Sequence, residues 1–144
     1  MKTIFATTQA SITAVGGFLG WYLGGLDGFL YALVAFVVVD YITGVMRAIL
    51  ERKLSSSIGA RGIFKKVAIF LIIGVAHLAD LYLLHESGVL RMATIFFFIS
   101  NEGVSLLENA AAIGLPVPEK LKNALAQLRD KGDKAKDDEV GKSD

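Results

Sequence analysis

The chain has 144 residues, of which 53% are hydrophobic and 20% are charged, and its formal net charge is +1. This hydrophobic fraction is above that of an ordinary soluble domain, so the composition favours a membrane protein. The sequence contains no cysteine, which excludes disulfide bonds, thiolate metal sites and cysteine nucleophiles.

Four stretches have the length, roughly 20 mostly apolar residues, that a helix needs to cross a bilayer. They are residues 4–26, 28–46, 67–84 and 92–112. The first stretch is uncharged but rich in Thr, Ser and Gly, whereas the last is polar in its second half. We therefore predict an all-α membrane protein with about four transmembrane helices, three being the alternative.

Glycine recurs at every fourth position through the first stretch, at Gly16, Gly20, Gly24 and Gly28. Such a flat ridge lets another helix approach closely, which favours helix association. A turn at the end of the stretch explains part of the same pattern. We interpret the first three of these glycines, together with Gly44 in the second stretch, as helix-association positions.

The second stretch places Asp40, Thr43, Gly44 and Arg47 on one helix face, at i, i+3, i+4 and i+7. Arg47 can snorkel to the membrane interface, which leaves Asp40 about 10 Å inside it. An intramembrane carboxylate either bonds a neighbouring helix or is a functional group. Both interpretations stay open for Asp40.

The loop after the second stretch predicts the orientation of the chain, because short loops rich in Lys and Arg remain in the cytoplasm. Its basic residues are Arg47, Arg52, Lys53, Arg61, Lys65 and Lys66. An even number of spans then places both termini in the cytoplasm, whereas three spans leave the N-terminus outside.

The basic loop could also contact anionic lipid headgroups, but we favour its interpretation as a topology signal. It lacks the interleaved aromatic residues that would indicate nucleic acid.

Ionisable residues also lie inside the third and fourth stretches. A rise of about 1.5 Å per residue puts His77 and Glu102 each roughly 15 Å deep, so we hypothesise that they meet near the midplane. Asp80 lies nearer the outer interface, where we expect a solvated carboxylate at a helix end.

Polar residues of the fourth stretch form a stripe. At 100° per residue, Asn101, Ser105, Glu108 and Asn109 share one face and Glu102 lies at its margin. Because an unpaired charge is unfavourable in lipid, the stripe must face protein or water. It is either a hydrogen-bonding seam between helices or the lining of a pore.

The sequence changes character after Gly114. Pro116 and Pro118 end the preceding helix, and the spacing of Leu121, Leu125 and Leu128 predicts one short amphipathic helix. From Gly132 onward the mixed charges are typical of a disordered tail. We thus expect a transmembrane domain over residues 1–115 and a cytoplasmic amphipathic helix and charged tail over residues 116–144.

No enzyme motif is present. The sequence has no phosphate-binding glycine loop, nucleophile elbow or paired-histidine zinc motif. The pairs His77 with Asp80 and His85 with Glu86 are too few for a convincing metal site. We therefore expect a protein that is not an enzyme, with no catalytic, cofactor-binding or metal site.

Several segments together resemble the phage-lysis and toxin-secretion holin family. They are DYITGVMRA, KLSSSIGARGIFKK, Asp80 and NEGVSLLENAAAIGLPVPEKL, within about residues 40–121. The family's motif positions correspond here to Asp40, Gly44, Arg61, Gly62, Lys66, Asp80, Asn101, Glu102, Ser105, Glu108, Asn109, Gly114 and Pro118.

The resemblance implies a small protein of the host bacterial cytoplasmic membrane that assembles into a homo-oligomer and forms holes. An endolysin, or in some relatives a large toxin, would pass as cargo rather than bind as a specific ligand. Membrane lipids, and in some cases an antiholin, are the other partners implied. A small ion or solute channel, and an antiholin or membrane scaffold, are the competing interpretations.

Overall fold

The computed structural model describes residues 1–124 and residue 127, and this part of the chain contains helices and turns but no strand. Its elements are α1 (Lys2–Tyr22), α2 (Gly28–Leu50), α3 (Ser56–Ala79), the π-helical turn η1 (Asp80–Leu84) and α4 (Val89–Ile113). Residues 119–124 are also helical. The all-α prediction is confirmed.

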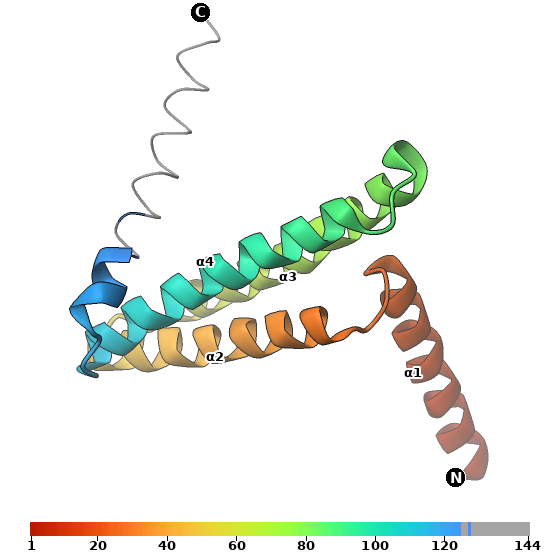
Figure 1. Cartoon of the computed structure of the whole chain (residues 1–144). Coiled ribbons are helices and arrows are strands. Elements are labelled where there is room, and N and C mark those ends of the chain that lie inside the picture. The colour runs from red at the N-terminus through yellow and green to blue at the C-terminus, as the bar shows by residue number, and fades with distance from the viewer. Residues whose placement is uncertain (125–126, 128–144) are drawn as a thin grey trace, which may run out of the picture.

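Helices α2, α3 and α4 form a bundle in which α2 and α4 pack most extensively (Figure 1). One end of the bundle carries the α2–α3 connection and the C-terminal end of α4, and we call it the basic end. The opposite end, called the linker end, carries residues 23–27, η1 and the start of α4. The apolar core consists of Leu33, Val37, Ile69, Ile73 and Ile95.

Local sequence explains where the helices begin and end. The side chain of Asp27 caps α2 by accepting a hydrogen bond of 2.9 Å from the Leu30 amide, and Ser55 caps α3 in the same way. At the end of α4, Gly114 has a φ of 106°, a conformation that favours glycine. The predicted break of the helix before Pro116 is therefore observed.

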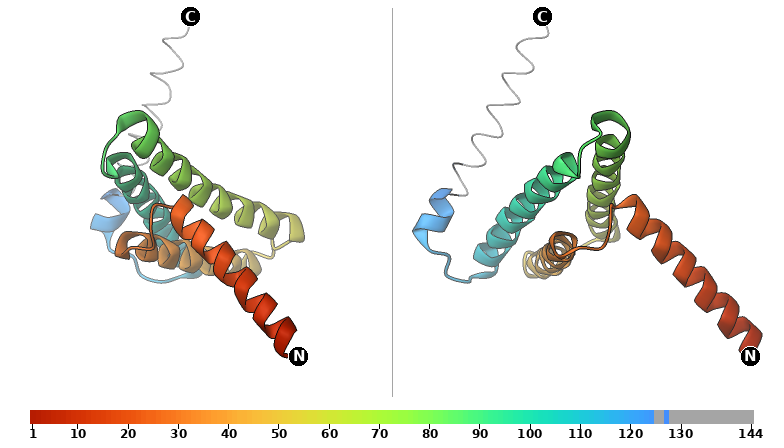
Figure 2. Two further views of the ribbon diagram at one scale, coloured as in Figure 1. Left: turned by 90° about the vertical axis from the view of Figure 1, so that its right-hand side faces the viewer. Right: turned by 45° about the vertical axis from the view of Figure 1, so that its right-hand side comes forward.

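Three helices among the described residues are long and apolar enough to cross a membrane: α2, α3 continued by η1, and α4. The fourth span is not confirmed, because Thr, Ser, Gln and Gly dilute the apolar residues of α1. Helix α1, which the structure describes completely, has no buried residue and projects away from the linker end (Figure 2). The structure thus supports the three-span alternative.

The boundaries of α3 correct a second prediction. Residues 56–66, expected within a basic loop, form the first turns of α3, and the actual connection between helices spans residues 51–55. A capping serine and a run of residues compatible with a helix outweigh the local charge. Of the predicted C-terminal helix, Leu121 is helical and exposed, whereas Leu125, Leu128 and the tail from Gly132 lie outside the described residues.

Candidate functional site

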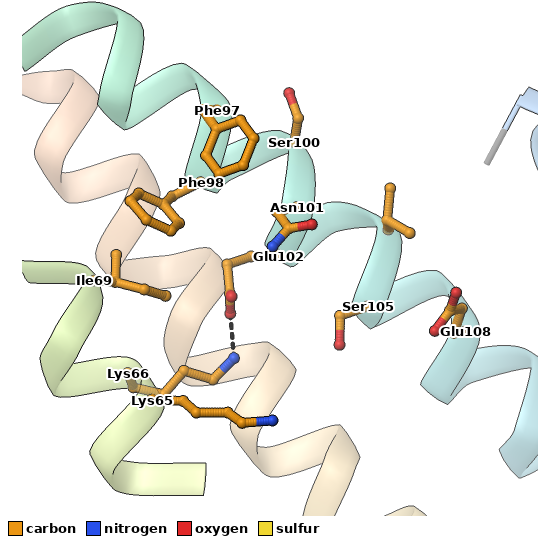
Figure 3. A pocket seen from close by; sticks show the side chains of 11 residues that line it. Lys65, Lys66, Ile69, Phe97, Phe98, Ser100, Asn101, Glu102, Ser105 and Glu108 are labelled. Carbon is orange, nitrogen blue, oxygen red and sulfur yellow. Dashed lines mark hydrogen bonds and ion pairs between the residues drawn. The ribbon is translucent and has the colours of Figure 1, made fainter. Parts of the chain in front are cut away.

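Three charged side chains from three different helices meet inside the bundle. The ammonium Nζ of Lys66 on α3 donates to Oδ2 of Asp40 on α2 and to Oε2 of Glu102 on α4. Both carboxylate residues are only 5% exposed. Figure 3 shows the contact between Lys66 and Glu102. We call these three residues the charge cluster.

Asn109 extends this cluster along α4. Its Nδ2 donates to Oδ1 of Asp40 at 3.2 Å and to Oγ1 of Thr43 at 3.3 Å. A Cβ added at Gly44 would lie 3.5 Å from the same nitrogen, so the glycine gives α4 room to approach α2. Hydrogen bonds and a small residue thus fix how these two helices pack.

The charge cluster lies well inside the spans: Asp40 and Glu102 are about halfway along theirs, and Lys66 is about a third of the way along α3 and η1. At about 1.5 Å per residue, Asp40 is about 15 Å from the end of α2 and Lys66 about 15 Å from the start of α3. A hydrocarbon core is about 30 Å thick, so the cluster lies near its middle. If all three groups are ionised, the positive charge of Lys66 compensates one of the two carboxylates. One negative charge is then left in excess.

A groove of about 610 Å³ runs between α3 and α4 beside this cluster (Figure 3). Its polar lining residues are Lys65, Lys66, Ser100, Asn101, Glu102, Ser105 and Glu108. A smaller cavity of about 270 Å³ lies between α2, α3 and α4 and reaches Asp40 and Asn109. The two cavities therefore place polar groups inside the bundle at the level of the charge cluster and toward the basic end.

The linker end is held together by a second buried cation, Arg91. Its guanidinium donates to the carbonyl oxygens of Leu23 and Gly25 and, at 2.7 Å, to Oδ2 of Asp27. This hydrogen bond lowers the pKa of Asp27 below its ordinary value of 3.8. Arg91 therefore fixes the α1–α2 connection against the start of α4.

Asp80 organises the same end and is only 1% exposed. Its two carboxylate oxygens accept hydrogen bonds from the amides of Leu90 at 2.9 Å and Arg91 at 2.8 Å. The expectation of a solvated carboxylate was wrong, because the π-helical turn carries Asp80 back over the first turn of α4. It caps the free amides there and complements the helix dipole.

Comparison with known proteins assigns the chain to a family. The model of the bacteriophage holin family matches residues 17–130. The chain belongs to this holin family. A protein of Bacillus phage phi105, named a probable holin, is 34% identical over 121 residues, which are 83% of this chain and 89% of that protein.

Bacterial relatives match this holin-family chain over similar lengths. An uncharacterised 14.9 kDa protein of Clostridium perfringens is 40% identical over 131 residues, 91% of this chain and 99% of that protein. An uncharacterised protein of Listeria monocytogenes is 40% identical over 114 residues, 79% of this chain and 81% of that protein. No solved structure matches the chain.

The holin-family stripe on α4 divides between two environments. Glu102 and Asn109 are buried against α2 and α3, as a hydrogen-bonding seam requires. Asn101, Ser105 and Glu108 instead line the groove. The seam interpretation is confirmed for Glu102, which also borders the groove, and for Asn109, whereas the lining of a pore by the stripe stays a prediction.

The hypothesised contact between His77 and Glu102 was wrong. Glu102 binds Lys66, about 16 Å from His77 along α3. The Nδ1 of His77 lies at the linker end, 2.7 Å from where a Cβ of Gly24 would be. The depth estimate failed because α3 begins at Ser56, which moves the middle of the span away from His77 and toward Lys66.

The predicted association glycines have different surroundings. Gly16 has open space around it, and the nearest atom to a Cβ at Gly20 belongs to Leu26, at 3.8 Å. Gly24 has a φ of 80° and lies against Arg91, so it serves the turn that the sequence also suggested. Only Gly44 contributes to the contact between α2 and α4 seen here.

The other basic residues of the predicted loop lie at or near the basic end. Glu51 binds Arg47 at 3.0 Å and Lys53 at 3.6 Å, and the hydrogen bond from Arg47 lowers the pKa of Glu51. The side chains of Arg52, Arg61 and Lys65 are exposed.

Sequence reasoning missed the roles of Lys66 and Arg91. Lys66 was predicted as a cation of the basic loop and as a family motif position, but not as the partner of two carboxylates. The signal that could have identified Arg91 is that it is the single Lys or Arg between residues 67 and 112.

Proposed function

We propose that this protein accumulates in the cytoplasmic membrane of the host bacterium and assembles into a homo-oligomer that forms holes. An endolysin, or a large toxin, would leave the cytoplasm through them as passing cargo. Holin-family membership and three apolar helices support this proposal. The observation that carries it is the polar seam buried at mid-membrane depth between α2, α3 and α4.

The charge cluster supplies a mechanism. In a sparse membrane, pairing within the bundle keeps Asp40, Lys66 and Glu102 away from lipid. As copies crowd together, the helices can exchange partners, so that the polar faces of many α4 helices surround common water. Water is the alternative to internal pairing for polar groups at this depth. Each elementary charge that moves across the membrane changes its electrostatic energy by about 2.3 kcal/mol per 100 mV of membrane potential. Movement of the charged side chains would therefore make the transition sensitive to this potential.

Three spans also define an orientation for this proposal. The basic end, with the C-terminal segment, faces the cytoplasm because its short connection is rich in Lys and Arg. The linker end then faces outward, and α1 begins on that side instead of crossing as a fourth span. An antiholin would bind the same α4 face and delay the exchange of partners.

Induction in bacteria with and without a cytoplasmic endolysin tests the function. Culture turbidity, viability and release of a folded reporter protein are followed after induction. Abrupt lysis that requires the endolysin, together with reporter release, is the expected result. Leakage of ions without reporter release would instead support a small channel, and the absence of any permeability would support an antiholin or scaffold.

A further inference from the structure

The interior of a single protomer differs on the two sides of the charge cluster. Toward the basic end, Ser105 and Glu108 follow Glu102 along α4 and line the groove of about 610 Å³. Toward the linker end, the completely buried side chains of Leu33, Ile73 and Ile95 fill the space between the helices. The groove is thus polar along α4 from Ser100 to Glu108, and beyond its inner end apolar side chains fill the space between the helices.

The chemistry of the groove decides what occupies it. Ser105 lies about 12 Å from the end of α4, a depth at which lipid tails surround a spanning helix. Hydrocarbon tails would offer no hydrogen bonds to the amide of Asn101, the hydroxyl of Ser105 or the exposed ammonium of Lys65. Water fills a cavity that is large enough and offers several polar partners.

We propose that each protomer contains a one-sided aqueous vestibule. It opens at the basic end, runs between α3 and α4 past the contact between Lys66 and Glu102, and ends against the apolar side chains of Ile69, Phe97 and Phe98. Water and small polar solutes enter it, and the apolar core prevents them from passing to the linker end. The vestibule belongs to the single protomer at low density, so it does not depend on hole formation.

Cysteine labelling tests this proposal, because the chain has no cysteine of its own. Ser105→Cys places a thiol in the groove with little change of size. Ser57→Cys, exposed at the basic end, is the positive control and marks that side. Val38→Cys, 49% exposed on the apolar surface of α2 near the level of Asp40, is the lipid-facing control.

Each variant is expressed at low level and treated with a small sulfonate-bearing methanethiosulfonate, in right-side-out and in inverted vesicles. Ser105→Cys should react from the same side as Ser57→Cys and on the order of tenfold faster than Val38→Cys, since lipid excludes the charged reagent. It should not react from the other side. Asn101→Cys, also on the groove, repeats the test in case one variant misfolds.

Two results would overturn the vestibule. If both groove thiols react as slowly as Val38→Cys, lipid or a second copy occupies the groove. If they react from both sides, the apolar core does not close the protomer. Loss of endolysin-dependent lysis would leave the labelling result unchanged, so the failure of this inference and that of the proposed function are distinguishable.

Discussion

At the scale of single residues, one ammonium group holds two carboxylates in the middle of the bundle. Lys66 on α3 binds Asp40 on α2 and Glu102 on α4. Removing one member of a buried ion pair is strongly destabilising because it leaves an uncompensated charge. Lys66 therefore contributes to the packing of all three spans.

We predict that Lys66→Met destabilises the bundle by roughly 3 kcal/mol, because two carboxylates then face each other without a cation. Thermal unfolding in detergent, followed by circular dichroism, measures the loss. Lys65→Met is the matched control. The side chain of Lys65 is exposed, so its replacement should reduce the stability of the bundle less.

Neutralising the partners as well should restore stability. The triple variant Asp40→Asn, Glu102→Gln, Lys66→Met has no unpaired charge, so its melting temperature should exceed that of Lys66→Met. A triple variant as unstable as the single one would show that Lys66 acts through packing and not through charge.

Asp27 makes a pH-dependent contribution at the linker end. Because Arg91 lowers its pKa in the folded state, Asp27 stabilises the fold above pH 3.8, and this stabilisation is lost as pH falls through the lower, folded-state pKa. We predict that wild type melts at a higher temperature than Asp27→Asn at pH 6. The difference should shrink below pH 3.8, and a difference independent of pH would contradict the assignment.

At the scale of elements, α1 joins the bundle at its C-terminal end. The hydroxyl of Tyr22 donates to the carbonyl oxygen of Leu71 at 2.8 Å, and the tyrosine ring lies against Gly74 on α3. A Cβ at Gly74 would come within 1.8 Å of that ring. Glycine is required there because the two elements approach closely.

We predict that Gly74→Ala displaces the end of α1 from α3. Trp21, the single tryptophan of the chain, directly precedes Tyr22, so its fluorescence emission should shift and its anisotropy should fall. Gly28→Ala, at a position with open space, is the control and should leave the emission unchanged. An unchanged spectrum for Gly74→Ala would mean that Tyr22 does not hold α1 in this position.

At the scale of the whole molecule, the apolar outer surface suits lipid while the polar groups lie between helices. Exposed apolar side chains such as Val38, Leu71 and Phe97 cover the spans. The polar residues that could line a water-filled assembly already lie on α4 and around the groove. Assembly would thus require helices to exchange neighbours and not to refold.

We predict that the double variant Glu102→Gln, Glu108→Gln delays endolysin-dependent lysis on the order of twofold at equal protein level, because neutral amides gain less from hydration than carboxylates. The time from induction to the drop in turbidity measures the delay. Glu119→Gln, the same exchange outside the spans, should leave this time unchanged. An unchanged time for the double variant would count against the hydration mechanism.

The sequence by itself determined the class of protein, three of its helices and the polar stripe. Composition, apolar length and the break from Gly114 to Pro118 are local properties, and these expectations were confirmed for α2, α3 and α4. The fourth span, predicted at α1 because that stretch is uncharged, was not confirmed, since Thr, Ser, Gln and Gly lower its apolar character. The prediction from sequence also placed the start of the third helix too late in the chain, because the basic residues before residue 67 were interpreted as a loop.

Only the tertiary structure decided which charges meet. Lys66 is 26 residues from Asp40 and 36 from Glu102, and Arg91 is 64 residues from Asp27. Such pairs depend on the register between neighbouring helices, which periodicity within one helix does not specify. The groove likewise exists because α3 and α4 separate toward one end, a consequence of how whole helices pack and not of any one segment.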